Sequence, residues 1–316
     1  MSFIPIDQVR SSRTPPAMDH QLSGIGRPRL PSWFKIRART GPDYLDIKHT
    51  MERLKLHTIC EEARCPNVWE CWNARTATFL ILGDICTRRC HYCAVTTGRP
   101  VALDREEPLR VAEAIQALGL RHAVVTSVNR DELEDGGAAI FAETIKHIRW
   151  LIPACTIEVL IPDFEGNEAA LATVTAEKPD ILNHNIETVR RLFPAIRPQG
   201  KYHRSIELLQ KAKRMGMRTK SGLMLGMGET MDEIREVMRD LRVAECDIMT
   251  IGQYLQPTKV HLPVARFYDP SEFALLKEEG MALGFTHVES GPLVRSSYHA
   301  DQQVISDREG RPSSTH

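Results

Sequence analysis

The fold is decided around residues 86–93, Cys86-Thr87-Arg88-Arg89-Cys90-His91-Tyr92-Cys93. Gaps of three and then two residues let the three thiols converge from one loop on a single cubic iron–sulfur cluster. The run lacks a fourth thiol, so one iron would stay open to bind another group and pass it an electron. The alternative is a structural zinc site, whose closed forms take four ligands from Cys and His. His91 would complete such a site only by bending back inside its own loop.

An apolar run precedes this loop, and further apolar runs follow it in alternation with helix-like segments. The sequence predicts strands at 77–82, 123–128, 156–161, 181–185, 218–224 and 248–251. It predicts helices near 108–118, 138–151, 168–176, 202–215 and 231–244. Six β/α repeats imply an α/β fold with right-handed crossovers, a partial (β/α)6 barrel at this length. An open doubly wound sheet is the alternative, because strand order is invisible in the sequence.

Four regions follow from this pattern. Residues 1–32 are polar and Pro-containing and predict a flexible arm. Residues 33–74 form an N-terminal extension that carries three more cysteines, and residues 75–270 form the barrel. Residues 271–316 add a C-terminal extension with a further helix, a short strand and a polar tail.

Composition narrows the classes of function. With 41 basic and 41 acidic residues the formal net charge is zero, so nothing indicates a nucleic acid or a membrane as partner. No apolar run approaches the roughly 18 residues of a membrane span, and residues 1–13 lack the apolar core of a signal peptide, which predicts a cytoplasmic protein. In a reducing compartment, eight cysteines with six between residues 60 and 93 argue for metal ligation over disulfides.

The 86–93 loop resembles the cysteine motif of the radical S-adenosylmethionine (radical SAM) enzymes. Together with a second set, Cys60, Cys65 and Cys71, it resembles one family within them, the lipoyl synthases. The family pattern is matched again at 126–138, 184–189, 220–229 and 252–257 and in the closing Arg295-Ser296-Ser297-Tyr298. The likeness covers about residues 33 to 300.

The resemblance implies two 4Fe–4S clusters. Cys86, Cys90 and Cys93 would hold the catalytic cluster, whose open iron chelates S-adenosylmethionine and splits it to a 5′-deoxyadenosyl radical. Cys60, Cys65 and Cys71 would hold an auxiliary cluster with Ser297, also counted as catalytic, on its fourth iron. The family takes from that cluster two sulfur atoms for C6 and C8 of an octanoyl chain amide-linked to a carrier lysine. An unactivated C–H bond offers an acid or base no handle, so cofactor-borne radical chemistry makes physical sense.

Polar residues at predicted strand ends are candidate S-adenosylmethionine contacts, because the carboxyl ends of parallel strands share one rim. The candidates are Tyr92, Asn129, Arg130, Glu187, Lys220, Gly226, Gly228 and Glu229. Core packing would equally explain Tyr92, and loop hydrogen bonding would explain Asn129, Arg130 and Glu187. Arg197 and Arg295 could bind a carboxylate, orient the clusters or form surface salt bridges. His57 and His91 receive no ligand role.

Partners and alternatives follow from the same likeness. The implied substrate is an octanoylated carrier protein, either a lipoyl domain or the glycine-cleavage H protein, and the implied electron donor is a flavodoxin or ferredoxin. One alternative is another radical SAM sulfur transferase, biotin-synthase-like or a methylthiotransferase. Another is a non-catalytic zinc or iron–sulfur module acting on RNA, although the chain is neutral and only 6% aromatic.

Overall fold

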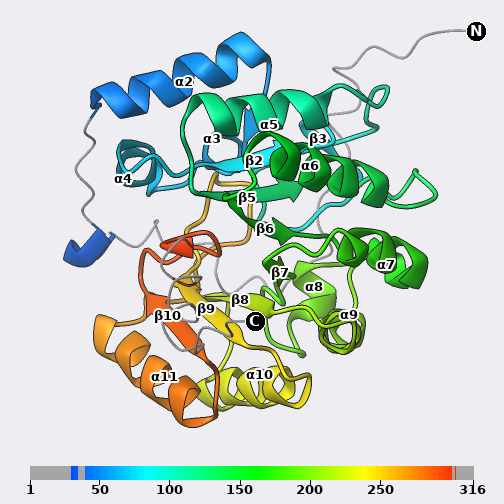
Figure 1. The fold of residues 1–316 in the computed structure, drawn as a ribbon. Helices are drawn as coiled ribbons and strands as arrows, with labels where there is room; N and C mark the ends of the chain where they lie inside the picture. Colours follow the sequence, from blue (N-terminus) through cyan, green and yellow to red (C-terminus); the bar gives the residue numbers. More distant parts are fainter. Residues whose placement is uncertain (1–29, 35–39, 301–302, 304–316) are drawn as a thin grey trace, which may run out of the picture. The chain divides into compact units, whose positions relative to one another are not determined.

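The computed structural model describes residues 30–34, 40–300 and 303. Its main sheet has eight strands in the order β1-β2-β5-β6-β7-β8-β9-β10 (Figure 1). The strands are β1 (His57–Thr58), β2 (Thr78–Ile81), β5 (His122–Ser127), β6 (Thr156–Leu160), β7 (Ile181–Asn183), β8 (Thr219–Leu225), β9 (Ile248–Gln253) and β10 (His287–Gly291). All neighbours pair in parallel except β1 with β2.

The strand order confirms the predicted barrel class. Neighbours in the sheet follow chain order, whereas a doubly wound sheet reverses its order at a switch point. Within the described residues β1 and β10 are the two edges and do not pair with each other, so the sheet forms a partial barrel. The six predicted strands correspond to β2, β5, β6, β7, β8 and β9.

Helices flank or connect these strands along the chain. They are α2 (Pro42–Leu54), α3 (Ile59–Glu62), α4 (Val68–Asn73), α5 (Glu107–Ala117), α6 (Ala138–Leu151), α7 (Glu168–Ala176), α8 (Phe193–Ile196), α9 (Tyr202–Arg214), α10 (Met231–Val243) and α11 (Pro270–Ala282). Local signals start several of them: Thr230 and Glu233 form a capping box on α10, and Asp269 caps α11 ahead of Pro270. Helix α8 was not predicted, because four residues are too few to show a helical period.

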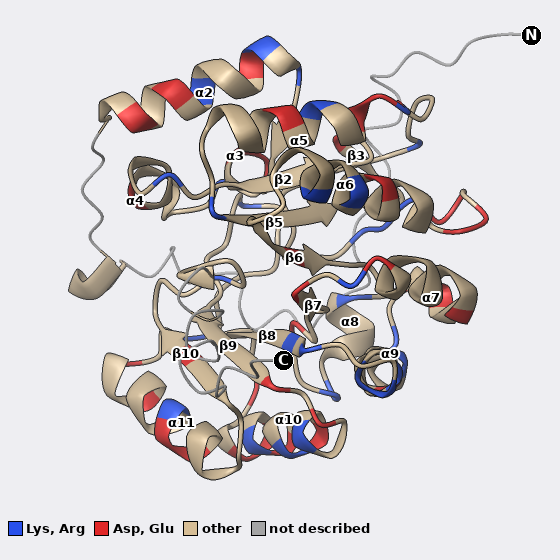
Figure 2. Cartoon of the chain, in the orientation of Figure 1, with Lys and Arg blue, Asp and Glu red and all other residues tan. Residues whose placement is uncertain are grey.

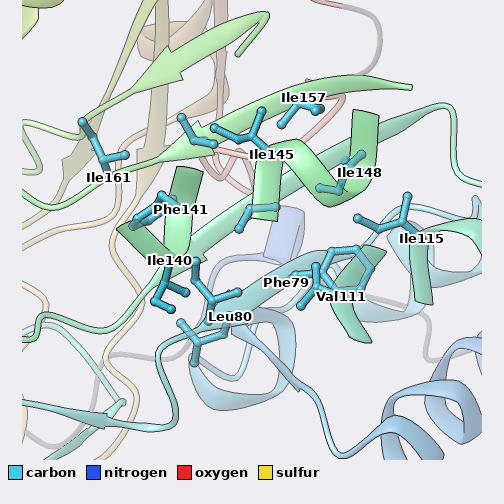
Figure 3. Close-up of a cluster of buried hydrophobic side chains, with 14 of the residues drawn as sticks. Phe79, Leu80, Val111, Ile115, Ile140, Phe141, Ile145, Ile148, Ile157 and Ile161 are labelled. Atoms are coloured by element: carbon cyan, nitrogen blue, oxygen red, sulfur yellow. The ribbon is translucent and has the colours of Figure 1, made fainter. Parts of the chain in front are cut away.

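The apolar core lies between the sheet and its helices. Figure 3 shows Phe79 of β2 beside Val111 of α5, and Ile145 of α6 near Ile157 of β6. These four side chains are fully buried. The burial of each side chain contributes roughly 1.5–3 kcal/mol to the stability of the fold. These contacts hold the helices against the sheet.

The N-terminal unit ends at Phe34, and its described part, 30–34, includes a short 3-10 helix, η2 (Ser32–Phe34). The predicted arm therefore lies outside the described residues apart from 30–32, and the polar tail lies outside them apart from Gln303. Basic and acidic residues are interspersed along α2 and α10 (Figure 2). In the part of the chain that the structure describes, no helix combines the length and apolarity needed to cross a membrane.

Candidate active site

The 86–93 loop leaves the barrel after β2 and is closed at its base by two short strands. These strands, β3 (Ile85–Cys86) and β4 (Thr96–Thr97), pair in parallel, and the Gly98 N–H donates to the Cys86 carbonyl at 3.0 Å. The end of β5 holds the loop from the other side. The Asn129 N–H donates to Cys86 Sγ at 3.3 Å, and the Thr87 N–H donates to the Asn129 carbonyl at 3.0 Å. The first cysteine is therefore fixed to the carboxyl end of a barrel strand.

The three thiols of this loop line one cavity of about 130 Å³ at the carboxyl ends of the strands. Burial, with smaller contributions from the neighbouring Cys90 and Cys86, raises the pKa of Cys93 to about 12 against a backbone N–H that lowers it. Burial likewise raises the pKa of Cys90, although the charge of Arg197 opposes the shift. Thiolates here need a compensating positive charge, which the iron ions of a cluster supply.

Polar atoms without partners surround the rest of the cavity. Ser127 Oγ, Asn129 Oδ1, Asn185 Oδ1 and Arg197 Nε are buried and lack a hydrogen-bond partner among the described residues, and all four residues line the cavity. Buried polar groups are normally paired, so this set is suited to a ligand that carries both donors and acceptors. The amino, carboxylate and ribose groups of S-adenosylmethionine match that requirement.

Glu187 and Tyr92 complete the polar side of this cavity. Glu187 has a left-handed backbone (φ 68°), held by hydrogen bonds to Gly222 and Met224 of β8. Such backbone costs a non-glycine residue about 1 kcal/mol or more and clusters at functional sites. Burial raises the pKa of Glu187, while the charge of Arg197 lowers it. Tyr92 also packs against an apolar cluster, so it both contacts the cavity and belongs to the core.

Arg130 and Lys220 do not line the cavity. Arg130 donates to the carbonyls of Leu82 and Val101 at 3.0 and 3.1 Å. Lys220 Nζ donates to Glu158 Oε2 at 3.0 Å, and both side chains are fully buried. These contacts hold the barrel together, and a cofactor contact for either residue stays a prediction.

The segment from Gly226 to Glu229 also lies apart from the cavity lining. Glu229 accepts the N–H groups of Gly226 and Met227 at 2.6 and 2.9 Å and so organises its own turn. Gly226 has φ 100°, and a Cβ there would lie 2.0 Å from Gln253 Nε2, so glycine is required. Gly228, with φ 108°, has open space around it. Cofactor contacts by these residues stay predictions as well.

The second cysteine set has Cys60 in α3, Cys65 in the loop after it and Cys71 in α4, with Cys60 buried and the other two half-buried. Burial, with a smaller contribution from Cys65, raises the pKa of Cys60 to about 12. Burial also raises the pKa of Cys71, and Cys60 and Cys65 add to that shift. The Cys65 N–H donates to the Cys60 carbonyl at 2.9 Å, so the first two cysteines of this set are joined through the backbone. Ile59, next to Cys60, lines the cavity described above, so the two cysteine sets are neighbours.

The end of the chain returns to this second set. Asn67 Nδ2 donates to the Leu293 carbonyl at 2.6 Å, and the Tyr298 hydroxyl donates to Glu70 Oε1 at 3.0 Å. Burial lowers the pKa of Arg295, and the nearby Cys65 opposes this. The half-buried Ser297 lies within this returning segment. In the described part of the chain, no three His, Cys, Asp or Glu side chains are arranged to hold a single metal ion.

Several residues around the loop were missed by the sequence reasoning. Arg88, inside the loop, pairs with Asp131 and Asp163 at 2.7 and 2.6 Å. His184 lines the cavity, and His261 Nε2 donates to the Cys93 carbonyl at 2.9 Å. A signal existed for Asp163, because it follows the third predicted strand as Asn129 follows the second. The strand-end argument applied to every strand would have found it.

Comparison with known proteins agrees with this geometry. The family model of the radical SAM superfamily matches residues 80–241, and the model of the N-terminal domain of lipoyl synthase matches residues 10–65. The likeness therefore begins well before residue 33, which corrects the expected start. At the level of fold alone, methylornithine synthase is similar with a TM-score of 0.52 and 14% identity, over 67% of this chain and 70% of that one.

Relatives named lipoyl synthase match most of the chain. The protein of Rubrobacter xylanophilus is 61% identical, with 90% of this chain and 89% of that protein covered. The protein of Shouchella clausii is 58% identical, with 87% and 90% covered. Such matches favour the predicted family over biotin-synthase-like enzymes, methylthiotransferases and non-catalytic metal modules. The chain belongs to the lipoyl synthase family of radical SAM enzymes.

Proposed function

We propose that the cysteine set that lines the cavity and the second set next to it carry out the reaction of this family: insertion of two sulfur atoms, at C6 and C8, into a protein-bound octanoyl group. The observation that supports this assignment is the position of Ile59, which lines the cavity of Cys86, Cys90 and Cys93 and precedes Cys60 in sequence. An octanoyl chain that is activated at Cys86, Cys90 and Cys93 therefore lies near Cys60, Cys65 and Cys71. The family works with S-adenosylmethionine and two 4Fe–4S clusters.

The residue roles are part of the proposal. Cys86, Cys90 and Cys93 hold the cluster that binds S-adenosylmethionine. Cys60, Cys65 and Cys71 hold the auxiliary cluster, with Ser297 as its fourth ligand. The contacts of Asn67 and Tyr298 support the last assignment, because they tie the segment that contains Ser297 to the loops between these cysteines.

The cavity's own residues bind and orient the cofactor. When bound, the clusters and S-adenosylmethionine supply one-electron chemistry at an alkyl carbon and the sulfur that is inserted. Asn129, Asn185 and Arg197 have unpaired buried atoms to satisfy the cofactor's polar groups. Arg197 is itself fixed by donating from Nη1 to the Asn185 carbonyl at 2.9 Å. Apolar neighbours such as Leu80 and Leu160 exclude water from the reacting carbon.

The finer identity of the partners is also proposed. The carrier is a lipoyl domain or the glycine-cleavage H protein, and the electron donor is a flavodoxin or ferredoxin. A cytoplasmic location is the matching expectation.

One experiment tests the reaction directly. The protein is purified anaerobically and incubated with a reductant, S-adenosylmethionine and an octanoylated lysine peptide, and the peptide is analysed by mass spectrometry. Gain of two sulfur atoms is expected. Cleavage of S-adenosylmethionine with no sulfur in the peptide would contradict the proposal.

Iron content tests the ligand assignments. Wild-type protein is expected to hold about eight irons, and Cys60→Ala or Cys86→Ala about four each, because each removes a ligand of one cubane. Cys246→Ala is the matched control, since its thiol is buried behind β8 and β9 and donates to backbone carbonyls there. Equal iron in all three variants would refute the assignment.

For Ser297, we expect Ser297→Cys to keep S-adenosylmethionine cleavage but impair sulfur insertion, and an unchanged lipoyl yield would refute its role.

A further inference from the structure

A chain of four alternating charges runs from the cysteine loop into the barrel wall. Arg88 Nη2 contacts Asp131 Oδ1 at 2.7 Å and Asp163 Oδ1 at 2.6 Å, and Arg204 Nη1 contacts Asp163 Oδ2 at 3.2 Å. Arg88 Nε also donates to Asp131 Oδ2 at 2.8 Å, so that pair is bidentate. The order is Asp131, Arg88, Asp163, Arg204, and the four charges sum to zero.

The two central charges of this arrangement are buried, so each needs a partner of opposite charge. The Arg88 side chain is 3% exposed and that of Asp163 1%. Charges persist at such depth only when they are paired and hydrogen-bonded, and removing one partner leaves the other uncompensated. The arginine fork fixes direction as well as distance, because its N–H groups lie in one plane and match a carboxylate edge. Arg88 therefore has one position relative to the two strand ends.

The same residue is part of the cluster loop. The Arg88 N–H donates to Cys86 Sγ at 3.4 Å, and Thr97 Oγ1 donates to the Arg88 carbonyl at 3.1 Å. Thr87, next along the loop, donates from Oγ1 to Asp131 Oδ2 at 3.0 Å. Arg88 also lines the cavity, and its Nη1 is buried without a hydrogen-bond partner in the described residues.

We propose that Arg88 is a positioning residue that fixes the Cys86–Cys93 loop to the ends of β5 and β6 and presents one N–H group to an anionic ligand of the cavity. The inference rests on the proposed role of this loop as the site of the S-adenosylmethionine cluster. The anionic group is either a sulfide of the cluster or the cofactor's carboxylate, and both are acceptors for a guanidinium. The carboxylates that pair with Arg88 follow the strands whose ends line the cavity. The ion pairs therefore hold the cysteine loop in a fixed position relative to a cofactor bound there.

The test compares anaerobic, cluster-loaded Arg88→Lys with wild type and with Arg204→Gln. Lysine keeps the charge but cannot bridge two carboxylates with a planar fork. Arg204→Gln is the matched control, since it removes another partner of the same Asp163 from helix α9 without touching the loop. The measurements are iron content, the electron paramagnetic resonance spectrum of the reduced cluster with and without S-adenosylmethionine, the cofactor's affinity, and the 5′-deoxyadenosine formed per sulfur inserted.

We expect Arg88→Lys to retain about eight irons, to change the spectrum, and to raise 5′-deoxyadenosine per sulfur by about tenfold through misplacement of the reacting groups. A spectral change without cofactor indicates the sulfide as acceptor. A change only with cofactor, together with weaker cofactor binding, indicates the carboxylate. Arg204→Gln should match wild type in spectrum and ratio.

A wild-type spectrum and ratio in Arg88→Lys, with melting lowered as in Arg204→Gln, would overturn the inference and leave Arg88 a structural residue. If Arg88→Lys does not fold or loses its iron, Asp131→Asn replaces it, since that variant keeps the Arg88–Asp163 pair. An altered spectrum in Asp131→Asn supports the inference, and a wild-type spectrum overturns it. Absence of a cofactor-sensitive signal in wild type itself would instead remove the proposed function and this inference with it.

Discussion

Replacing Lys220 by methionine tests whether this buried cation serves the barrel or the cofactor. Lys220 Nζ lies 3.0 Å from Glu158 Oε2, and both side chains are 0% exposed. Glu158 Oε1 accepts Asn183 Nδ2 at 2.9 Å, so the carboxylate is held from a second strand as well. Burial lowers the pKa of Lys220, and the charge of Glu158 opposes that shift. The pair lies in the interior, and neither Lys220 nor Glu158 lines the cavity.

The expected cost follows from what methionine leaves behind. Methionine fills most of the space, so little cavity forms, but the Glu158 carboxylate loses its counter-charge at full burial. Breaking one side of such a pair costs about 3–5 kcal/mol. At about 2 °C per kcal/mol for a chain of this size, melting should fall by roughly 6–10 °C. The double variant Glu158→Gln/Lys220→Met should recover part of this loss, because no buried charge then remains.

The assay is anaerobic thermal unfolding followed by circular dichroism, alongside measurement of S-adenosylmethionine affinity. Lys211→Met is the control, since its partner Glu168 is 67% exposed and such surface pairs contribute about 0–1 kcal/mol. We expect Lys220→Met to lose stability while the folded fraction binds the cofactor normally. Near wild-type melting combined with lost cofactor affinity would refute the structural role and return Lys220 to the cofactor site.

Two further predictions concern His184 and Asn67. Burial, aided by the charge of Arg197, lowers the pKa of His184 to about 4, so this buried ring is neutral near pH 7. The stability it contributes is complete above the unfolded pKa of about 6.5 and is lost as pH falls toward 4, which amounts to about 1.3 kcal/mol between pH 7.5 and 5.5. Urea unfolding at both pH values should show this loss in wild type and not in His184→Gln. Asn67→Ala removes the 2.6 Å hydrogen bond to the Leu293 carbonyl, worth about 1 kcal/mol. The segment that contains Ser297 should then be cleaved about fivefold faster in limited proteolysis at low protease concentration, because cleavage follows the equilibrium population of the open form when reclosing is faster than cleavage.

Each of these has a defined contradiction. An equal loss of stability in His184→Gln would show that another group titrates in that pH range. For the proteolysis, Thr173→Ala is the control, because it removes a hydrogen bond within α7, to the Ala169 carbonyl. Equal cleavage rates in Asn67→Ala and Thr173→Ala would mean that Asn67 does not hold the C-terminal segment.

Local sequence signals were sufficient to predict the main strands and helices and the residue types of the candidate ligands. The alternation of apolar runs and helical periods placed every strand from β2 to β9 that builds the barrel, because burial on both faces demands continuous apolar residues. The two-residue strands β1, β3 and β4 and the short helices α3, α4 and α8 were not predicted, since two to six residues carry too little period. Their formation depends on contacts with distant residues.

The functional site divides in the same way. The spacing of Cys86, Cys90 and Cys93 and the rim rule for parallel strands were enough to predict a cluster loop at one end of the sheet, because both depend on local sequence. Asn129 and Glu187 were predicted from strand ends and do line the cavity, whereas Arg130 and Lys220 satisfied the same rule but turn to internal partners. Side-chain direction at a strand end is set by neighbouring strands, which the sequence does not display.

The sequence by itself was enough to predict candidate thiol ligands at fixed spacings, a parallel α/β architecture and the family to which the chain belongs. The tertiary structure decided which polar groups meet. Only the fold brings Asp131 and Asp163 from separate strands to the two sides of Arg88, and only the fold returns Leu293 to Asn67 across 226 residues of sequence. Pattern and spacing act over a few residues, whereas buried charges and the returning segment find their partners through the packing of the whole sheet.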